Sequence, residues 1–347
     1  MPLRTLGFAG VADLRFSRAA VERTIDGATR QLYVLAGLAA LVMYLAILPV
    51  LARLAKRLPL PVDPIRRAKI GGLKSALARR ELVLHYQPKL AVSTAEVVGV
   101  EALVRWNHPQ RGLLGPAEFL PLAESSPELL AALTCQVLER ALGDCAGWMR
   151  DEMQLPVAVN VPASALVDAS LASTIQDTLV AHGLEPTMLT LEVTESAMME
   201  QVGDLLVPLT ELRALGVSVS IDDFGTGHSS LARLQSLPLD EIKVDRSFVA
   251  GITVDERDRK ITRLIIGLGS ELGLQVVAEG VEDEETLDLL RTLGCSVAQG
   301  FYISRPLPEN LLRQWLARER WGISGAAVRT PGSPLTRPLE MAPRSVA

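Results

Sequence analysis

The sequence predicts an α/β fold in which a mostly parallel sheet closes into a barrel. Short apolar runs alternate with helical stretches through the central part of the 347-residue chain, and such alternation is typical of a parallel sheet. The expected strands number about eight, which closes a barrel in a domain of roughly 250 residues. Hydrophobic residues make up 48% of the chain, so a substantial core can be buried.

The expected elements follow one another in a regular order. Residues 82–90 and 96–104 are apolar runs joined by a polar stretch, which predicts a hairpin. A helix is expected over residues 127–150. Six short strands follow at 156–161, 188–193, 217–221, 241–244, 275–278 and 296–298, separated by helical stretches such as 202–215, 257–272 and 284–293.

Outside this domain, the feature that stands out is an uncharged run over residues 32–52. It has the roughly 20 residues that a helix needs to cross a bilayer, although a buried core helix is an alternative. A short segment, 1–31, precedes it, and a basic, Pro-rich linker, 53–69, follows it. Basic residues after the span place that side in the cytoplasm. The barrel domain is expected over 70–321, and a disordered tail over 322–347.

Charge and cysteine content exclude several classes of function. The net charge of −5 offers no basic surface for a nucleic-acid polymer. Cys135, Cys145 and Cys295 are odd in number and form no CxxC pair. The sequence therefore predicts buried free thiols rather than a disulfide framework or a zinc site.

Polar side chains gather at the ends of the expected strands. Asp222 and Asp223 follow the run 217–221 and lead into a Gly-rich turn. Successive side chains of a strand point to opposite faces, so these two carboxylates converge only if the strand ends there. Corresponding positions on other strands hold Glu101, Asn160, Glu192, Lys243, Glu279 and Gln299, with Glu195 and Asp245 just beyond two of the strand ends.

The carboxyl ends of barrel strands converge on one mouth. A single acid there is more often a helix N-cap or a solvated loop residue, but five carboxylates together would repel one another without a cation. Carboxylate and amide oxygens suit Mg2+ or Mn2+. The adjacent Asp222 and Asp223 indicate two ions, which can hold both oxygens of a phosphoryl displacement. The pattern favours a metal-dependent hydrolase of an anionic substrate.

Five sequence blocks resemble, in order, those of the EAL-domain family of cyclic di-GMP phosphodiesterases. The blocks are Glu101-Ala-Leu-Val-Arg105, Asp222-Asp-Phe-Gly-Thr-Gly227, Ile242-Lys-Val-Asp245, Val277-Ala-Glu-Gly-Val-Glu282 and Gln299-Gly-Phe301. The first triplet alone is a weak motif, whereas the five blocks in order across residues 70–318 are specific. The resemblance implies a TIM-like (β/α)8 barrel with an antiparallel first strand. It also implies hydrolysis of cyclic di-GMP to linear pGpG with Mg2+ or Mn2+. Together with the uncharged run 32–52, the resemblance predicts a single-pass phosphodiesterase of the inner (cytoplasmic) membrane.

The same resemblance implies roles for the polar residues. The expected metal ligands are Glu101, Asn160, Glu192, Asp222, Asp223 and Glu279, with Asp222 bridging two ions. The expected catalytic residues are Glu279, Lys243 and Glu101, and Lys243 resembles the lysine that holds the attacking water. The expected substrate-binding residues are Gln87, Arg105 and Gln299. Glu195 resembles the glutamate that steadies the loop after Asp223.

Some alternatives stay open at this stage. Lys243 could simply neutralise Asp245, and Glu282 is expected to cap the following helix. His228 stands where the family usually has an aromatic residue, and we expect a surface histidine without a role. The resemblance also implies a possible homodimer. A non-catalytic cyclic di-GMP receptor that signals through the membrane helix is the alternative function, although the intact ligand set argues against it.

Overall fold

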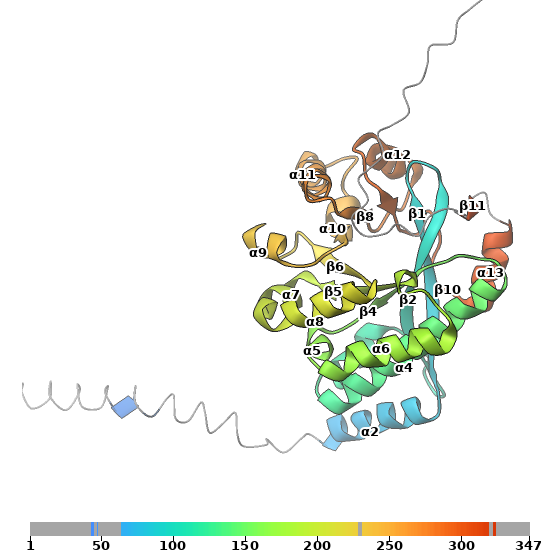
Figure 1. Ribbon diagram of the computed structural model, residues 1–347, viewed down its shortest axis with the longest axis vertical. Coiled ribbons are helices and arrows are strands. Elements are labelled where there is room, and N and C mark those ends of the chain that lie inside the picture. Colours follow the sequence, from blue (N-terminus) through green and yellow to red (C-terminus); the bar gives the residue numbers. More distant parts are fainter. Residues whose placement is uncertain (1–42, 45–46, 48–63, 228–230, 319–321, 324–347) are drawn as a thin grey trace, which may run out of the picture. The chain divides into compact units, whose positions relative to one another are not determined.

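The computed structural model describes residues 43–44, 47, 64–227, 231–318 and 322–323 (Figure 1). Contacts divide the chain into two units, Met1–Arg67 and Ala68–Ala347. In the described residues, no helix is both long and apolar enough to span a bilayer. The predicted span, 32–52, lies outside the described residues except for three positions, and His228 lies outside them too.

Eight strands of the second unit form a closed barrel. They are β1 Leu82–Ala91, β2 Glu96–His108, β4 Val157–Asn160, β5 Leu189–Thr194, β6 Ser218–Phe224, β7 Glu241–Val244, β8 Gln275–Ala278 and β9 Val297–Ala298. Neighbours pair in parallel from β2 through β4 and onward to β9. Strand β1 runs antiparallel to both β2 and β9 and closes the ring. The predicted barrel with an antiparallel first strand is confirmed.

Three short strands extend the sheet beyond the barrel. They are β3 Gly112–Leu114, β10 Leu307–Pro308 and β11 Gly322–Ile323. Strand β3 pairs with the last residues of β2, β10 with β1, and β11 with the first residues of β2. Strand β11 occupies the first two positions of the predicted tail, and residues 324–347 lie outside the described part of the chain.

Helices lie between successive strands and flank the barrel (Figure 1). They are α2 Pro64–Ala78, α3 Pro116–Ala123, α4 Pro127–Arg150, α5 Ala163–Leu166, α6 Ala169–His182, the 3-10 turn Pro186–Met188, α7 Glu195–Glu200, α8 Val202–Leu215, α9 Leu231–Ser236, α10 Arg246–Val249, α11 Glu256–Leu272, α12 Glu284–Thr292 and α13 Glu309–Arg318. Helix α2 begins inside the predicted linker.

Local sequence signals set several helix ends. Helix α4 begins after Ser126, whose hydroxyl accepts a hydrogen bond from the Leu129 amide, with Pro127 in the first turn. Helix α12 begins after Asp283, whose carboxylate accepts from the Thr286 amide at 2.7 Å. The expectation that Glu282 caps this helix is therefore wrong by one residue. Short side chains such as Asp reach the amides of the first turn most easily.

The strands separate an apolar layer from a polar barrel interior. Side chains such as Val219 and Ile221 are fully buried in the hydrophobic core. Because side chains alternate along a strand, Ser220 and Asp222 of the same strand point the other way, into the barrel. Buried charged groups, among them Lys89 and Lys243, occupy that interior. The fold thus gathers ionisable side chains inside the barrel instead of the branched aliphatic layers usual in such folds.

Candidate metal and substrate site

Strand β2 delivers Glu101 to the barrel mouth from its middle, not from near its end as expected. The strand runs on to His108 because its last residues pair with β3. Its pairing with β4 stops at Ala102 and Val159. Glu101 therefore lies at the rim of the barrel although seven residues of the strand follow it.

The two adjacent aspartates converge by a route that differs from the predicted one. Strand β6 continues through both of them to Phe224, and its register with β7 shifts between Ile221 and Phe224. Asp223 takes a left-handed conformation with φ 55°, which aspartate tolerates better than most residues. An irregularity inside the strand, not its end, brings both carboxylates to one side.

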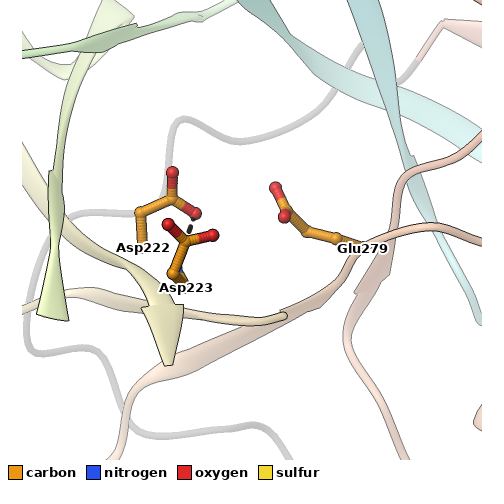
Figure 2. A group of neighbouring side chains, drawn as sticks. All are labelled: Asp222, Asp223 and Glu279. Carbon is orange, nitrogen blue, oxygen red and sulfur yellow. Dashed lines mark hydrogen bonds between the residues drawn. The ribbon is translucent and has the colours of Figure 1, made fainter. Parts of the chain in front are cut away.

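Asp222, Asp223 and Glu279 form a group of carboxylates at the mouth (Figure 2). One oxygen of each lies within 4.8 Å of the others. Asp222 Oδ1 also accepts a hydrogen bond from the Asp223 amide at 2.9 Å. Glu279, which directly follows β8, faces the two aspartates in Figure 2. Three of the predicted metal ligands are thus brought together from two parts of the barrel.

Lys243 lies behind these carboxylates and is only 1% exposed. Its Nζ lies 2.7 Å from Glu279 Oε1, 2.9 Å from Glu192 Oε2, 3.1 Å from Asp222 Oδ1 and 3.5 Å from Glu101 Oε2. Asp245 instead caps α10 by accepting from the Ser247 amide. The lysine therefore compensates the charge of the mouth carboxylates, and the alternative in which it merely neutralises Asp245 is not supported.

Amide side chains hold Glu101 from both sides. Asn160 Nδ2 donates to Glu101 Oε1 at 2.7 Å, and Gln299 Nε2 donates to Glu101 Oε2 at 2.6 Å. Gln299 Nε2 also lies 3.2 Å from Gln87 Oε1, and Gln87 Nε2 donates to the Ser304 carbonyl at 3.0 Å. Two predicted substrate-binding glutamines thus belong to a hydrogen-bonded chain that ends on a predicted metal ligand.

Glu195 holds the turn that follows Asp223. Its Oε2 accepts hydrogen bonds from the amides of Gly225 at 2.8 Å and Gly227 at 3.2 Å. Gly225 has φ 102°, a conformation that side chains rarely adopt. A Cβ at Gly227 would lie 2.7 Å from Glu195 Oε1. The conformation favours glycine at position 225, and a side chain at position 227 would displace the Glu195 carboxylate. These contacts are those that a loop-stabilising glutamate would make.

A cavity of about 770 Å³ opens above the carboxylates. Gln87, Arg105 and Gln299 line it together with the carboxylates of the mouth. Arg105 is half-buried, and its Nη1 donates to the Val104 carbonyl at 2.9 Å. One wall is apolar and comes from α3 and α4 through Leu120, Leu130 and Leu133. The cavity thus combines charged and hydrophobic walls, as small-molecule sites do.

Burial and mutual repulsion perturb the mouth carboxylates. Burial, reinforced by Asp222 and Glu101, raises the pKa of Glu279 to about 8 although Lys243 opposes the shift. Burial and the neighbouring Asp222 raise the pKa of Asp223 to about 6. The pKa of Glu192 instead falls to about 2, because Lys243 and Lys89 outweigh the effect of its burial. Glu192 is therefore ionised while part of the cluster resists ionisation.

These residues fit a hard divalent cation. The carboxylates supply oxygen donors from neighbouring strands, which is the ligand type that Mg2+ and Mn2+ prefer. Burial and then repulsion from neighbouring carboxylates raise the pKa values of Asp223 and Glu279, although Lys243 opposes both shifts. A further positive charge between Asp222, Asp223 and Glu279 would relieve that repulsion.

Sequence reasoning missed two buried charges, Lys89 on β1 and Glu241 at the start of β7. Lys89 Nζ lies 2.8 Å from Glu192 Oε1 and 3.0 Å from Glu241 Oε1. Neither residue lies at the carboxyl end of its strand, so the strand-end rule did not select them. The signal that could have found them is a charged residue inside an expected barrel strand, where an unpaired charge is costly.

The fold and the site define a TIM-like barrel whose mouth is rich in carboxylates that fit a divalent cation. A family model described as "EAL domain" matches residues 71–306, and the chain belongs to the EAL domain family.

Two similar proteins come from Pseudomonas aeruginosa. The bifunctional diguanylate cyclase/cyclic di-GMP phosphodiesterase MucR is 45% identical over 241 residues, which cover 69% of this chain and 35% of MucR. The cyclic di-GMP phosphodiesterase NbdA is 47% identical over 250 residues, or 72% of this chain and 32% of NbdA. The chain therefore spans about a third of the length of these curated relatives.

Solved structures show the same fold. The structure described as "PaMucR Phosphodiesterase, c-di-GMP complex" has a TM-score of 0.68 and 44% sequence identity, and the match covers 71% of this chain and 99% of that chain. The "EAL Enzyme Bd1971" in its cAMP and cyclic-di-GMP bound form has a TM-score of 0.68 and 28% identity, covering 79% of this chain and 75% of that chain.

Proposed function

We propose that this chain is a phosphodiesterase that hydrolyses cyclic di-GMP to linear pGpG with Mg2+ or Mn2+, and that two ions take part. The observation that carries the proposal is the carboxylate group of Asp222, Asp223 and Glu279 with Lys243 behind it. MucR and NbdA carry the name of this activity, and the MucR structure is a complex with c-di-GMP. The intact ligand set favours catalysis over the receptor alternative.

The chain's own residues would bind and orient the substrate. Arg105 on the cavity wall can hold phosphate oxygens with its guanidinium. The apolar wall of Leu120, Leu130 and Leu133 can receive the planar bases. Divalent ions held by the carboxylates would supply a nucleophile from water at neutral pH and neutralise charge on the phosphate.

Lys243 and Glu101 would keep this arrangement in place. Lys243 holds the mouth acids in one cluster through its contacts with Glu192, Asp222 and Glu279. Asn160 and Gln299 fix both oxygens of Glu101. Preorganised groups of this kind lose little energy to reorganisation during the reaction.

Turnover of cyclic di-GMP by the full chain tests the proposal. The purified protein is incubated with cyclic di-GMP and Mn2+ or Mg2+, and pGpG is separated by chromatography. We expect release of pGpG that ceases in EDTA. A folded protein that binds cyclic di-GMP in EDTA but never releases pGpG would instead be the receptor.

Residues 32–52 carry the second part of the proposal, attachment to the inner membrane. The run has no charge and is long enough to span the bilayer. We expect the full chain to stay in the membrane pellet after carbonate extraction. Leu41→Arg, which costs about 3 kcal/mol at a helix centre, should release it, whereas a wild-type chain found in the supernatant contradicts the anchor.

A homodimer remains a prediction from family resemblance. Light scattering of the purified chain measures it directly, with a mass twice that of the 37.4 kDa protomer expected. A monomer at all concentrations would contradict it.

A further inference from the structure

Lys89 and Glu241 form a buried ion pair that the proposed function does not use. Lys89 is 5% exposed and Glu241 is 8% exposed. Their Nζ and Oε1 atoms lie 3.0 Å apart. Replacing a buried ion pair by apolar residues is often neutral or stabilising, so fold stability gives this pair no reason to exist. Lys89 also contacts Glu192, and this contact suggests a reason for the pair.

The two oxygens of Glu192 are held by two different lysines. Lys89 binds Oε1 at 2.8 Å, and Lys243 binds Oε2 at 2.9 Å. Lys243 is also the group that contacts the cavity-lining Asp222 and Glu279. Oε2 therefore faces the carboxylate cluster, while Oε1 faces the Lys89–Glu241 pair. Because a carboxylate is planar, fixing Oε1 also fixes the direction of Oε2.

We propose that Lys89 is a positioning residue, which anchors Glu192 Oε1 away from the site so that Oε2 is presented to a divalent cation. Glu241 is a second counter-ion of the Lys89 ammonium. The inference rests on the proposed function, because it needs Glu192 to be a metal ligand. Partners that orient metal ligands typically contribute 10–100-fold to metal affinity.

Charge and orientation act on cation binding in opposite directions when Lys89 alone is removed, so the experiment has to hold the net charge constant. Removing the Lys89 ammonium would by charge alone strengthen the binding of a cation. Losing the orientation of Glu192 would weaken it. The double variant Lys89→Met/Glu241→Gln removes one charge of each sign, so the net charge of the barrel interior stays the same. It also avoids leaving Glu241 buried without a partner, which is strongly destabilising.

Mn2+ binding to the full chain is measured without nucleotide, from the electron paramagnetic resonance signal of free Mn2+. We expect Lys89→Met/Glu241→Gln to bind Mn2+ at least about 10-fold more weakly than wild type. Glu241→Gln alone leaves the contact between Lys89 and Glu192 intact, so its affinity for Mn2+ should fall less than about threefold. Thermal unfolding in EDTA confirms that each variant is folded. If the double variant does not fold, Lys89→Met/Glu241→Leu is used in its place, because leucine leaves no polar group at position 241.

A double variant that binds Mn2+ as tightly as wild type overturns the inference and leaves the proposed function intact. A Glu241→Gln variant that loses as much affinity as the double variant also overturns it, because the counter-ion would then matter more than Lys89. A wild-type chain that binds no Mn2+ is a different result, since it removes the metal site and the proposed function together.

Discussion

Asp223 shows how one residue's backbone decides the geometry of the site. The sequence predicted that the two acids would converge because the strand ends at them. The structure keeps the strand and places Asp223 at φ 55° within a register shift. The adjacency of the acids could be used for prediction, because it is local in the chain. The register shift of β6 could not be predicted from the sequence, because it depends on pairing with β7.

Replacing Asp223 by asparagine should separate its charge from its conformation. Asn also tolerates the left-handed region, and it removes a carboxylate that is repelled by Asp222, so Asp223→Asn is expected to fold with a thermal midpoint in EDTA at pH 7 at least as high as that of wild type. Its hydrolysis of cyclic di-GMP should fall at least about 100-fold, since even outer partners of metal ligands contribute 10–100-fold. Asp177→Asn, on the exposed face of α6, is the matched control and should leave the rate unchanged.

The raised pKa values of Glu279 and Asp223 predict a pH dependence of stability. Their folded-state pKa values, about 8 and about 6, exceed the unfolded values, so the protonated forms favour the folded state. That stabilisation is present at low pH and is lost as pH rises through the folded pKa values. In EDTA, the thermal midpoint should therefore fall from about pH 5 to about pH 8.5.

Mn2+ and Glu279→Gln are the two controls for this pH dependence. Mn2+ stabilises the ionised carboxylates and should remove most of the fall. Glu279→Gln cannot ionise at this position and should flatten the curve in EDTA. A wild-type midpoint that rises across the same pH range would show that the cluster is not strained by its own charge.

At the scale of elements, the turn after β6 depends on contacts between Glu195 and glycine amides. Gly227→Ala would push a methyl group against Glu195 Oε1, 2.7 Å away. We expect a loss of stability of about 1–3 kcal/mol together with reduced turnover. Gly267→Ala in α11 is the control, because its Cβ meets nothing within 4 Å, and it should stabilise the protein by up to about 1 kcal/mol. Equal midpoints for the two variants would contradict the role of the turn.

Strand ends were the part of the site that the sequence could predict. Asn160 ends β4, while Glu279 and Gln299 directly follow β8 and β9. Their positions follow from the rule that the carboxyl ends of parallel strands meet. Glu101 was placed wrongly within its strand, because β3 lengthens β2 beyond the barrel rim. The predicted cap of α12, Glu282, was wrong by one residue, because the adjacent Asp283 caps the helix instead.

At the scale of the whole molecule, the closed barrel brings together charges that are remote in the chain. Lys89 lies 103 residues before Glu192 and 152 residues before Glu241 in sequence. The alternation of strands and helices predicted the barrel, since it repeats along the chain. The interior network was not predictable in the same way, because its partners meet only once the ring is closed.

Hydrolysis of cyclic di-GMP tests the central claim most directly. The full chain, Glu279→Gln and the surface control Glu211→Gln on α8 are assayed side by side with Mn2+, with thermal unfolding as the check of folding. The account predicts that wild type and Glu211→Gln release pGpG at similar rates, while Glu279→Gln is at least about 100-fold slower. Folded wild-type protein that binds Mn2+ and cyclic di-GMP yet releases no pGpG would contradict it.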